Sequence, residues 1–396
     1  MTRSAARRIV MLSVPAATLA AALMVVAIEA WARATWNVRQ GEPGFYVADP
    51  RRGQKLGAGY DGWFAGVPVK VNQLGFRDDR EYALAKGPRT FRILVLGDSV
   101  TFGHGSVFEH TYPYLLEQQL RQWRPAIDWQ VWNLGVPGYN TRQEWAYLTE
   151  VAQAYAPDLV IVGFFPNDVT GNTMPPPAGA ITRARSRAIS WVRAHWYSVE
   201  WYRRAYLTLR WNLTATAGEQ RRMAELRAED RPILEGAEIA DAEDQRLTPF
   251  ETLPADQVAA IQCSSGSKPG TEGVENLQRE AGWPDFVDAV RALQAMHASG
   301  AVRLVFFLNT APPVCPDGDF FYDGGYSYVN NLFLEVMGRG VPAVSDFDAF
   351  LPLRPSQMPN AGGHSLGNAN LVKASVLSAY LQGSVLPPLL DAVGAR

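Results

Sequence analysis

Strands alternate with helices along most of the chain. Nearly continuous apolar runs of strand length occur at 91–96, 129–134, 158–165, 303–309 and 341–345, as expected for parallel strands buried on both faces. Between them, apolar residues at three- and four-residue spacings predict helices at 107–123, 141–155, 285–299, 328–338 and 368–381. The alternation predicts an α/β fold, a doubly wound, flavodoxin-like five-stranded parallel sheet between helices.

The amino-terminal segment has a different pattern. Residues 9–28 are 20 residues without a charge, and at about 1.5 Å per residue they span roughly 30 Å, the thickness of a hydrocarbon core. Because Arg3, Arg7 and Arg8 precede this run, we expect a retained signal anchor with its tip in the cytoplasm and the bulk of the chain periplasmic or extracellular. A cleaved signal peptide is the alternative, since Ala32 and Ala34 form a small-x-small site.

These patterns divide the chain into four parts. We predict a cytoplasmic tip and transmembrane anchor at 1–35, a β-rich lead-in at 36–90, an α/β domain formed by 91–171 and 283–396, and an insertion at 172–282.

The insertion has two halves of opposite charge. Residues 181–211 hold seven Arg against one Glu with aromatic residues at helical spacing, which predicts one basic amphipathic helix. Such a helix can lie on a lipid surface, bind a partner helix or pack as a lid on its own domain, and we favour the lid. Residues 219–245 hold nine acidic residues against four Arg and are expected to be a solvated face.

Composition limits the classes of function. With 396 residues, 47% hydrophobic residues, twelve Trp and a formal charge of -2, the chain is globular and has no global electrostatic signature of nucleic-acid binding. It has no dinucleotide or Walker motif, so we expect no nucleotide cofactor. Cys263 and Cys315 have no metal-ligand spacing, and no metal is expected. In an exported chain they form one disulfide or remain two separate buried thiols.

Polar residues follow the predicted strands where an open parallel sheet binds ligands. Gly97-Asp98-Ser99 follows the first strand, Asn133 to Gly138 ends the second, and Asn167-Asp168 follows the third. A loop with His364 precedes the last helix. In this order the blocks resemble those of the SGNH/GDSL hydrolase superfamily, over residues 70–170 and again over 340–382, with Phe165 in place of one family glycine.

The resemblance implies acyl transfer through a serine ester. Ser99 is the expected nucleophile and His364 its general base, because an imidazole pKa lies close to neutral pH. The backbone N–H groups of Ser99 and Gly138 and the amide of Asn167 are the expected oxyanion hole. Asp98 is expected to brace the turn.

One position departs from the family. Its Asp three residues before the histidine is Ala361 here. Asp346 or Asp348, after the fifth strand, is a candidate replacement. Otherwise Asn360 or a carbonyl orients the ring, or the activity has been lost. A triad without its acid can retain substantial catalysis.

Two other patterns receive structural interpretations. The sequence 363–367 fits G-x-S-x-G, but that motif needs a strand before it and a later histidine, and we predict no strand at 354–362. His104 and His110 are expected at the surface or behind the reacting groups.

The leading hypothesis is a membrane-anchored SGNH-type esterase or O-acyltransferase acting on acetyl or other acyl esters. Glycans are the expected substrates, from the resemblance to envelope and exopolysaccharide members. The alternative is a catalytically impaired accessory or structural subunit of a membrane complex, with an integral-membrane protein partner. A lipase acting at the bilayer is a third option.

Overall fold

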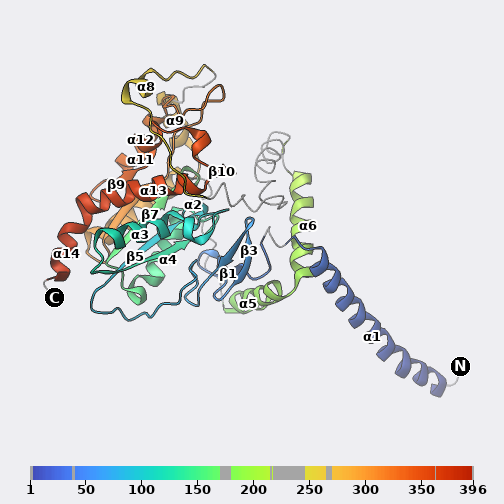
Figure 1. Cartoon of the computed structure of the whole chain (residues 1–396). Coiled ribbons are helices and arrows are strands. Elements are labelled where there is room, and N and C mark those ends of the chain that lie inside the picture. Colours follow the sequence, from blue (N-terminus) through green and yellow to red (C-terminus); the bar gives the residue numbers. More distant parts are fainter. Residues whose placement is uncertain are drawn as a thin grey trace.

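Five parallel strands form the central sheet of the computed structural model (Figure 1), which describes residues 3–37, 41–169, 180–214, 216, 246–264, 270–361 and 363–394. In spatial order they are β6 (Asp128–Gly135), β5 (Thr90–Gly97), β7 (Leu159–Phe164), β8 (Leu304–Leu308) and β9 (Ala343–Ser345). In chain order this is 2-1-3-4-5, which confirms the predicted flavodoxin-like arrangement. The order of the strands reverses beside β5, and ligands bind at such a point in open α/β sheets.

Alternate residues of each strand enter two separate cores. In β5, Phe91, Ile93 and Val95 face one side of the sheet, and Leu94 and Leu96 face the other. The first side is covered by α3 (Tyr112–Trp123), α13 (Gly367–Tyr380) and α14 (Leu386–Gly394), and the second by α4 (Thr141–Tyr155), α10 (Trp283–Ala298) and α11 (Tyr326–Met337). Burial on both faces explains the nearly continuous apolar runs.

Most predicted boundaries differ from the observed ones by only a few residues. The helix predicted at 107–123 is a 3-10 turn, η2 (Phe108–His110), followed by α3. The remaining short helices are α8 (Ala255–Ala260), α9 (Gly270–Arg279), α12 (Phe347–Phe350), η4 (Pro355–Gln357) and η5 (Leu381–Val385).

One local prediction was wrong. Residues 354–362, predicted to lack a strand, contain the two-residue strand β10 (Asn360–Ala361), which pairs with β11 (His364–Ser365). The Asn360 side chain accepts a hydrogen bond from the Gly363 amide at 3.1 Å. This bond closes a tight turn between the two strands, which the strand pattern of the sequence does not show.

The lead-in forms two antiparallel hairpins. They are β1 (Tyr46–Asp49) with β2 (Gly53–Leu56), and β3 (Asp61–Phe64) with β4 (Val67–Lys70). Phe45 and Phe64 stack on each other and pack edge-on against Phe102, which lies just after β5. The hairpins therefore share the α4-side core, and Phe64 comes close to the carboxyl end of the sheet.

The helix α1 (Arg3–Thr35) extends away from the rest of the molecule (Figure 1). An 18-residue window of its segment Ser13–Thr35 has a mean hydropathy of 1.8, and none of that window is buried against the chain. Among the described residues it is the one helix long and apolar enough to cross a membrane.

The basic segment is two helices rather than the single predicted one. They are α5 (Ala180–His195) and α6 (Tyr197–Thr214), separated at Trp196. The break has a tertiary cause, because the Glu29 carboxylate of α1 accepts the amide N–H groups of Tyr197 at 3.0 Å and Ser198 at 2.9 Å. An acceptor at these groups caps a new helix.

One face of these helices packs on the lead-in, where Ser190 Oγ accepts the Ala48 amide at 3.1 Å and Arg204 donates to the Gly41 carbonyl at 3.0 Å. The other face of α6 is exposed. Tyr202, Tyr206, Leu209 and Leu213 are 57–77% exposed. The predicted acidic face at 219–245 lies outside the described residues.

Candidate active site

Ser99 begins a short helix at the carboxyl end of the central strand. This helix, α2 (Ser99–Phe102), is capped by Asp98, whose Oδ1 accepts the Val100 amide at 2.8 Å. Ser99 itself is only 9% exposed. Asp98 thus braces the turn, as expected from the sequence, and Ser99 lies beside the reversal of the strand order, where both neighbouring strands also end.

Three glycines make room for α2. Gly97, Gly135 and Gly163 lie in register on β5, β6 and β7. A Cβ atom would lie 2.0 Å from Thr101 Oγ1 at Gly97, 2.3 Å from the Phe102 nitrogen at Gly135, and 2.4 Å from Thr101 Oγ1 at Gly163. Helix α2 therefore rests directly on the strand ends, and only residues without a side chain fit beneath it.

His364 reaches Ser99 from the opposite end of the sequence. Its Nε2 lies 2.8 Å from Ser99 Oγ, although 265 residues separate them. The hydroxyl also lies 3.4 Å from Asp98 Oδ2, a longer and weaker contact. The arrangement is that of a nucleophile and a base within hydrogen-bond reach.

A fully buried arginine holds the turn that follows the serine. Arg77 donates to the carbonyl oxygens of Phe102 at 2.8 Å, Gly103 at 2.7 Å and Ser106 at 2.6 Å. Burial lowers the pKa of Arg77 to about 10, so its guanidinium remains a cation at neutral pH. No pattern in the sequence points to a role for Arg77, which lies on the lead-in.

The same turn is tied to the histidine hairpin. Ser106 Oγ donates to the Ser365 carbonyl at 3.2 Å, and Asn370 Nδ2 donates to both Ser106 Oγ at 3.0 Å and that carbonyl at 2.8 Å. These bonds fix the backbone next to His364 relative to the backbone that follows Ser99. Isolated polar residues of this kind have no sequence signature.

His104 stacks on the base. The rings of His104 and His364 have centroids 4.3 Å apart and an interplanar angle of 26°. The rings of Phe64 and His104 are nearly perpendicular, with centroids 5.4 Å apart. The His104 amide also donates to the Ser99 carbonyl at 3.0 Å. Burial, with the neighbouring charges of His364 and Arg77, holds the pKa of His104 well below its usual value.

The expected oxyanion donors lie on neighbouring loops. Gly138 follows β6 with a φ of +82°, a left-handed conformation that favours glycine. Asn167 lies in η3 (Pro166–Val169), and its amide donates to Asp98 Oδ2 at 3.2 Å.

Three carboxyl groups lie buried near these loops. Burial raises the pKa of Asp98, and it raises the pKa values of Glu144 and Asp168 well above their usual range, with mutual repulsion adding to the effect. Asp168 also accepts the Phe165 amide at 3.1 Å. Their described contacts give Asp98 and Asp168 a bracing role at the strand ends.

The two candidate acids of the triad have other surroundings. Asp346 accepts the Thr310 amide at 2.7 Å and pairs with Lys373 at 3.8 Å, and Asp348 is exposed. None of the described contacts of Asp346 or Asp348 involves His364. Asn360, the other candidate, binds the Gly363 amide, and Ala361 lies directly opposite His364 in the hairpin register.

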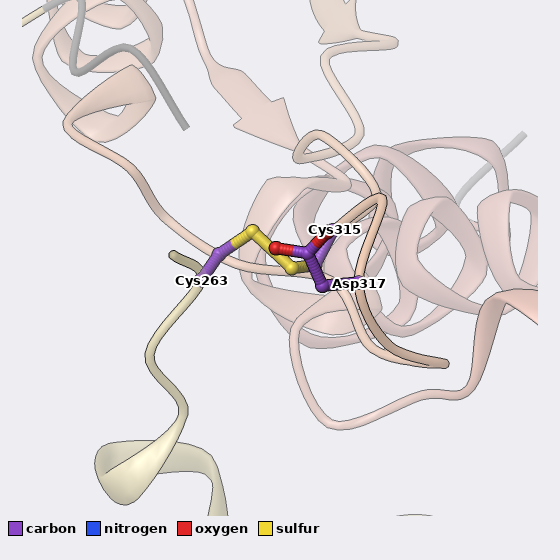
Figure 2. Close-up of side chains that lie close together, drawn as sticks. All are labelled: Cys263, Cys315 and Asp317. Atoms are coloured by element: carbon purple, nitrogen blue, oxygen red, sulfur yellow. A yellow bond between two sulfur atoms is a disulfide. The ribbon is translucent and has the colours of Figure 1, made fainter. Parts of the chain in front are cut away.

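Cys263 and Cys315 are joined by a disulfide (Figure 2). This was one of the two alternatives left open by the sequence. Asp317 lies beside them and completes the one cluster of metal-ligating residue types among the described residues. Because both sulfurs are bonded to each other, neither offers the thiolate that a metal would bind.

Comparison with known proteins identifies the class. Residues 95–238 match the model of the GDSL-like Lipase/Acylhydrolase family, a range that includes Ser99, Gly138 and Asn167 and ends before His364. The protein is therefore an ester hydrolase by class. More particularly, residues 95–238 are similar to the GDSL-like lipases and acylhydrolases. No curated protein matches the chain.

The solved structures to which this chain shows similarity include three hydrolases. LAE5, an alpha/beta hydrolase enzyme from the metagenome of Lake Arreo, is 14% identical over 74% of this chain and 94% of its own, with a TM-score of 0.35. A catalytic mutant of Axe2, an acetylxylan esterase from Geobacillus stearothermophilus, is 12% identical over 74% and 93%, with a TM-score of 0.36. The lipase Lip_vut3 from a goat rumen metagenome is 10% identical over 74% and 99%, with a TM-score of 0.36.

Proposed function

We propose that the protein is a membrane-anchored serine esterase or O-acyltransferase in which Ser99 is the nucleophile and His364 the general base. The observation that carries the proposal is the 2.8 Å contact between Ser99 Oγ and His364 Nε2. A serine hydroxyl is a weak nucleophile at neutral pH unless an adjacent base removes its proton. The proposal assigns the role of third triad member to neither Asp346 nor Asp348.

The reaction proceeds through an acyl-serine ester. Ser99 Oγ attacks the ester carbonyl as His364 takes its proton, and the imidazolium then protonates the departing alcohol. Water or a sugar hydroxyl next loses a proton to His364 and attacks the acyl-serine, which releases the acid or the transferred ester and restores Ser99. Hydrolysis and acyl transfer thus differ only in the second acceptor.

Negative charge on the carbonyl oxygen requires fixed donors. We assign the backbone N–H groups of Ser99 and Gly138 and the Asn167 side chain to this role. Loss of one such donor typically raises the barrier by about 3 to 4 kcal/mol.

The substrate class follows from the resemblance and from the compartment. We propose acetyl or other acyl esters of glycans on the outer side of the membrane, with Ser13–Thr35 as the retained anchor. Arg3, Arg7 and Arg8 precede the apolar run, which favours a cytoplasmic amino end. The disulfide supports an oxidising periplasmic or extracellular location for the rest of the chain.

Turnover of chromogenic acetyl and butyryl esters by the full-length protein in detergent tests the assignment. We expect Ser99→Ala and His364→Ala each to lower kcat by at least about a thousandfold. The matched controls, Ser375→Ala on the exposed face of α13 and His110→Ala, should retain activity. A fluorophosphonate should label wild type but not Ser99→Ala. If the Ser99→Ala variant still turned over the esters and were still labelled by the fluorophosphonate, the assignment would be wrong.

The acceptor is tested separately. Mass spectrometry after incubation with an acetyl donor and an oligosaccharide should show O-acetylated product if the protein is a transferase. Free acetate alone would assign it to hydrolysis.

A catalytically impaired accessory subunit is the second candidate. It is favoured by Ala361, which lies opposite His364, and by the 9% exposure of Ser99. Absence of turnover and of serine labelling, together with stable co-purification of an integral-membrane protein, would establish it.

A further inference from the structure

An imidazole that acts as a base needs a fixed ring plane. The reacting Nε2 of His364 must stay aimed at Ser99 Oγ while the proton moves, and a misplacement of about 1 Å can cost about a hundredfold in rate. In the family that this chain resembles, an acidic residue three positions earlier performs this task, and the chain has Ala361 there. The His364 ring also stacks on the ring of His104, with 4.3 Å between centroids and 26° between planes, a contact that opposes rotation out of this plane.

We propose that His104 is a positioning residue, which holds the His364 imidazole in its reactive plane by stacking against it. The inference rests on the function proposed above and extends it. His104 does not touch the reacting atoms. Its ring stacks on the His364 ring, with 4.3 Å between centroids, and meets the Phe64 ring nearly perpendicularly, with 5.4 Å between centroids. The ring that supports the base is therefore itself in contact with the lead-in.

The backbone of His104 is fixed on the nucleophile's own turn. Its amide donates to the Ser99 carbonyl at 3.0 Å, and Arg77 holds the carbonyls of Gly103 and Ser106 on either side. A movement of His104 relative to Ser99 would break these bonds. The stack therefore fixes the plane of the His364 ring relative to Ser99.

The charge state of His104 suits this role. The charged groups that act on it are the Arg77 guanidinium and His364, and these with burial keep its pKa low. Two stacked imidazolium rings would repel each other. A neutral ring instead presents a π face to the cation that His364 becomes during the reaction, and this interaction is attractive.

Three substitutions separate stacking from other roles. His104→Phe keeps a flat ring without ring nitrogens, His104→Gln keeps a hydrogen-bonding group without a ring, and His104→Ala keeps neither. If stacking positions the base, Ala and Gln should lower kcat for the acetyl ester by between about 3-fold and 30-fold, with KM unchanged. Phe should restore kcat to within about threefold of wild type.

The experiment uses full-length protein in detergent, with His110→Phe as the matched control on the neighbouring turn η2. Thermal unfolding of each variant shows whether it folds. If His104→Ala does not fold, His104→Phe, which fills a similar volume, still tests the role of the ring. Wild-type kcat in His104→Ala would overturn the inference. Recovery by Gln but not by Phe would also overturn it, because it would show a hydrogen-bonding role.

The failure of the inference is distinguishable from the failure of the proposed function. If Ser99→Ala abolishes turnover while the His104 variants remain fully active, only the positioning role is wrong. If Ser99→Ala remains active, the assignment of the nucleophile is wrong whatever the His104 variants show.

Discussion

Lys373 and Asp346 form an ion pair inside the molecule. Their side chains are 4% and 0% exposed, and Lys373 Nζ lies 3.8 Å from Asp346 Oδ2. Burial raises the pKa of Asp346 to about 6 even though Lys373 and the Thr310 amide favour its ionised form, and burial lowers the pKa of Lys373. Burying the ionised Asp346 and the protonated Lys373 therefore each costs free energy, and the attraction between the two charges offsets part of that cost.

Lys373→Met removes the cation and leaves the carboxyl group buried. At pH 8 we expect this change to lower the free energy of unfolding by about 3 to 5 kcal/mol. A carboxyl with a raised folded-state pKa stabilises the folded state below its unfolded pKa of about 3.9, and that contribution is lost as the pH rises through about 6. The two-unit difference corresponds to about 3 kcal/mol. The loss of unfolding free energy caused by Lys373→Met should therefore be smaller at pH 5, where Asp346 is protonated, than at pH 8.

Removal of both charges is the control. At pH 8 the free energy of unfolding of the double variant Asp346→Asn with Lys373→Met should be within about 1 kcal/mol of the wild-type value, or higher than it, because no uncompensated charge stays buried. The measurement is denaturant unfolding of the full-length protein in detergent, followed by near-ultraviolet circular dichroism at both pH values. An equal deficit of Lys373→Met at pH 5 and pH 8, or a double variant as unstable as the single one, would refute the electrostatic reasoning.

Three further outcomes are expected. Gly97→Ala should destabilise the fold by at least about 3 kcal/mol, because its Cβ would lie 2.0 Å from a threonine hydroxyl, whereas Gly383→Ala, with nothing within 4 Å, should leave the unfolding midpoint unchanged. Asn167→Ala should lower kcat by about 100- to 1000-fold with little change in KM, and a loss of less than fivefold would remove it from the oxyanion hole. Cys263→Ser with Cys315→Ser should lower the free energy of unfolding by about 4 kcal/mol, the loop-entropy value for a separation of 52 residues. Identical denaturation curves for oxidised wild type and the serine pair would contradict this.

Features determined by nearby residues were predictable from the sequence. The strands of the central sheet are buried on both faces, so their residues form nearly continuous apolar runs. Helix α4 begins at its predicted residue because Asn140 and Gln143 cap it reciprocally within four residues of chain. Ser99 follows a central strand, and its contact with His364 agrees with what the resemblance implies.

Features determined by distant residues were not predictable. The basic segment shows a continuous helical period, yet Glu29 divides it from more than 160 residues away. Arg77 and Asn370 hold the two turns of the site as single polar residues on separate elements. His104 lies five residues after Ser99, and that closeness was its one signal, but only the fold shows which face of its ring meets His364.

The contact between Glu29 and the start of α6 has a consequence for how the enzyme meets its substrate. With the proposed anchor in a bilayer, the Glu29 carboxylate joins the membrane helix to α6 through the amides of Tyr197 and Ser198 and through the Ser198 hydroxyl at 2.6 Å. The two helices then move together, and these hydrogen bonds help to set the height of Ser99 above the lipid. For the glycan esters proposed above, the height of Ser99 then limits which of them can reach it, before any pocket selects among them.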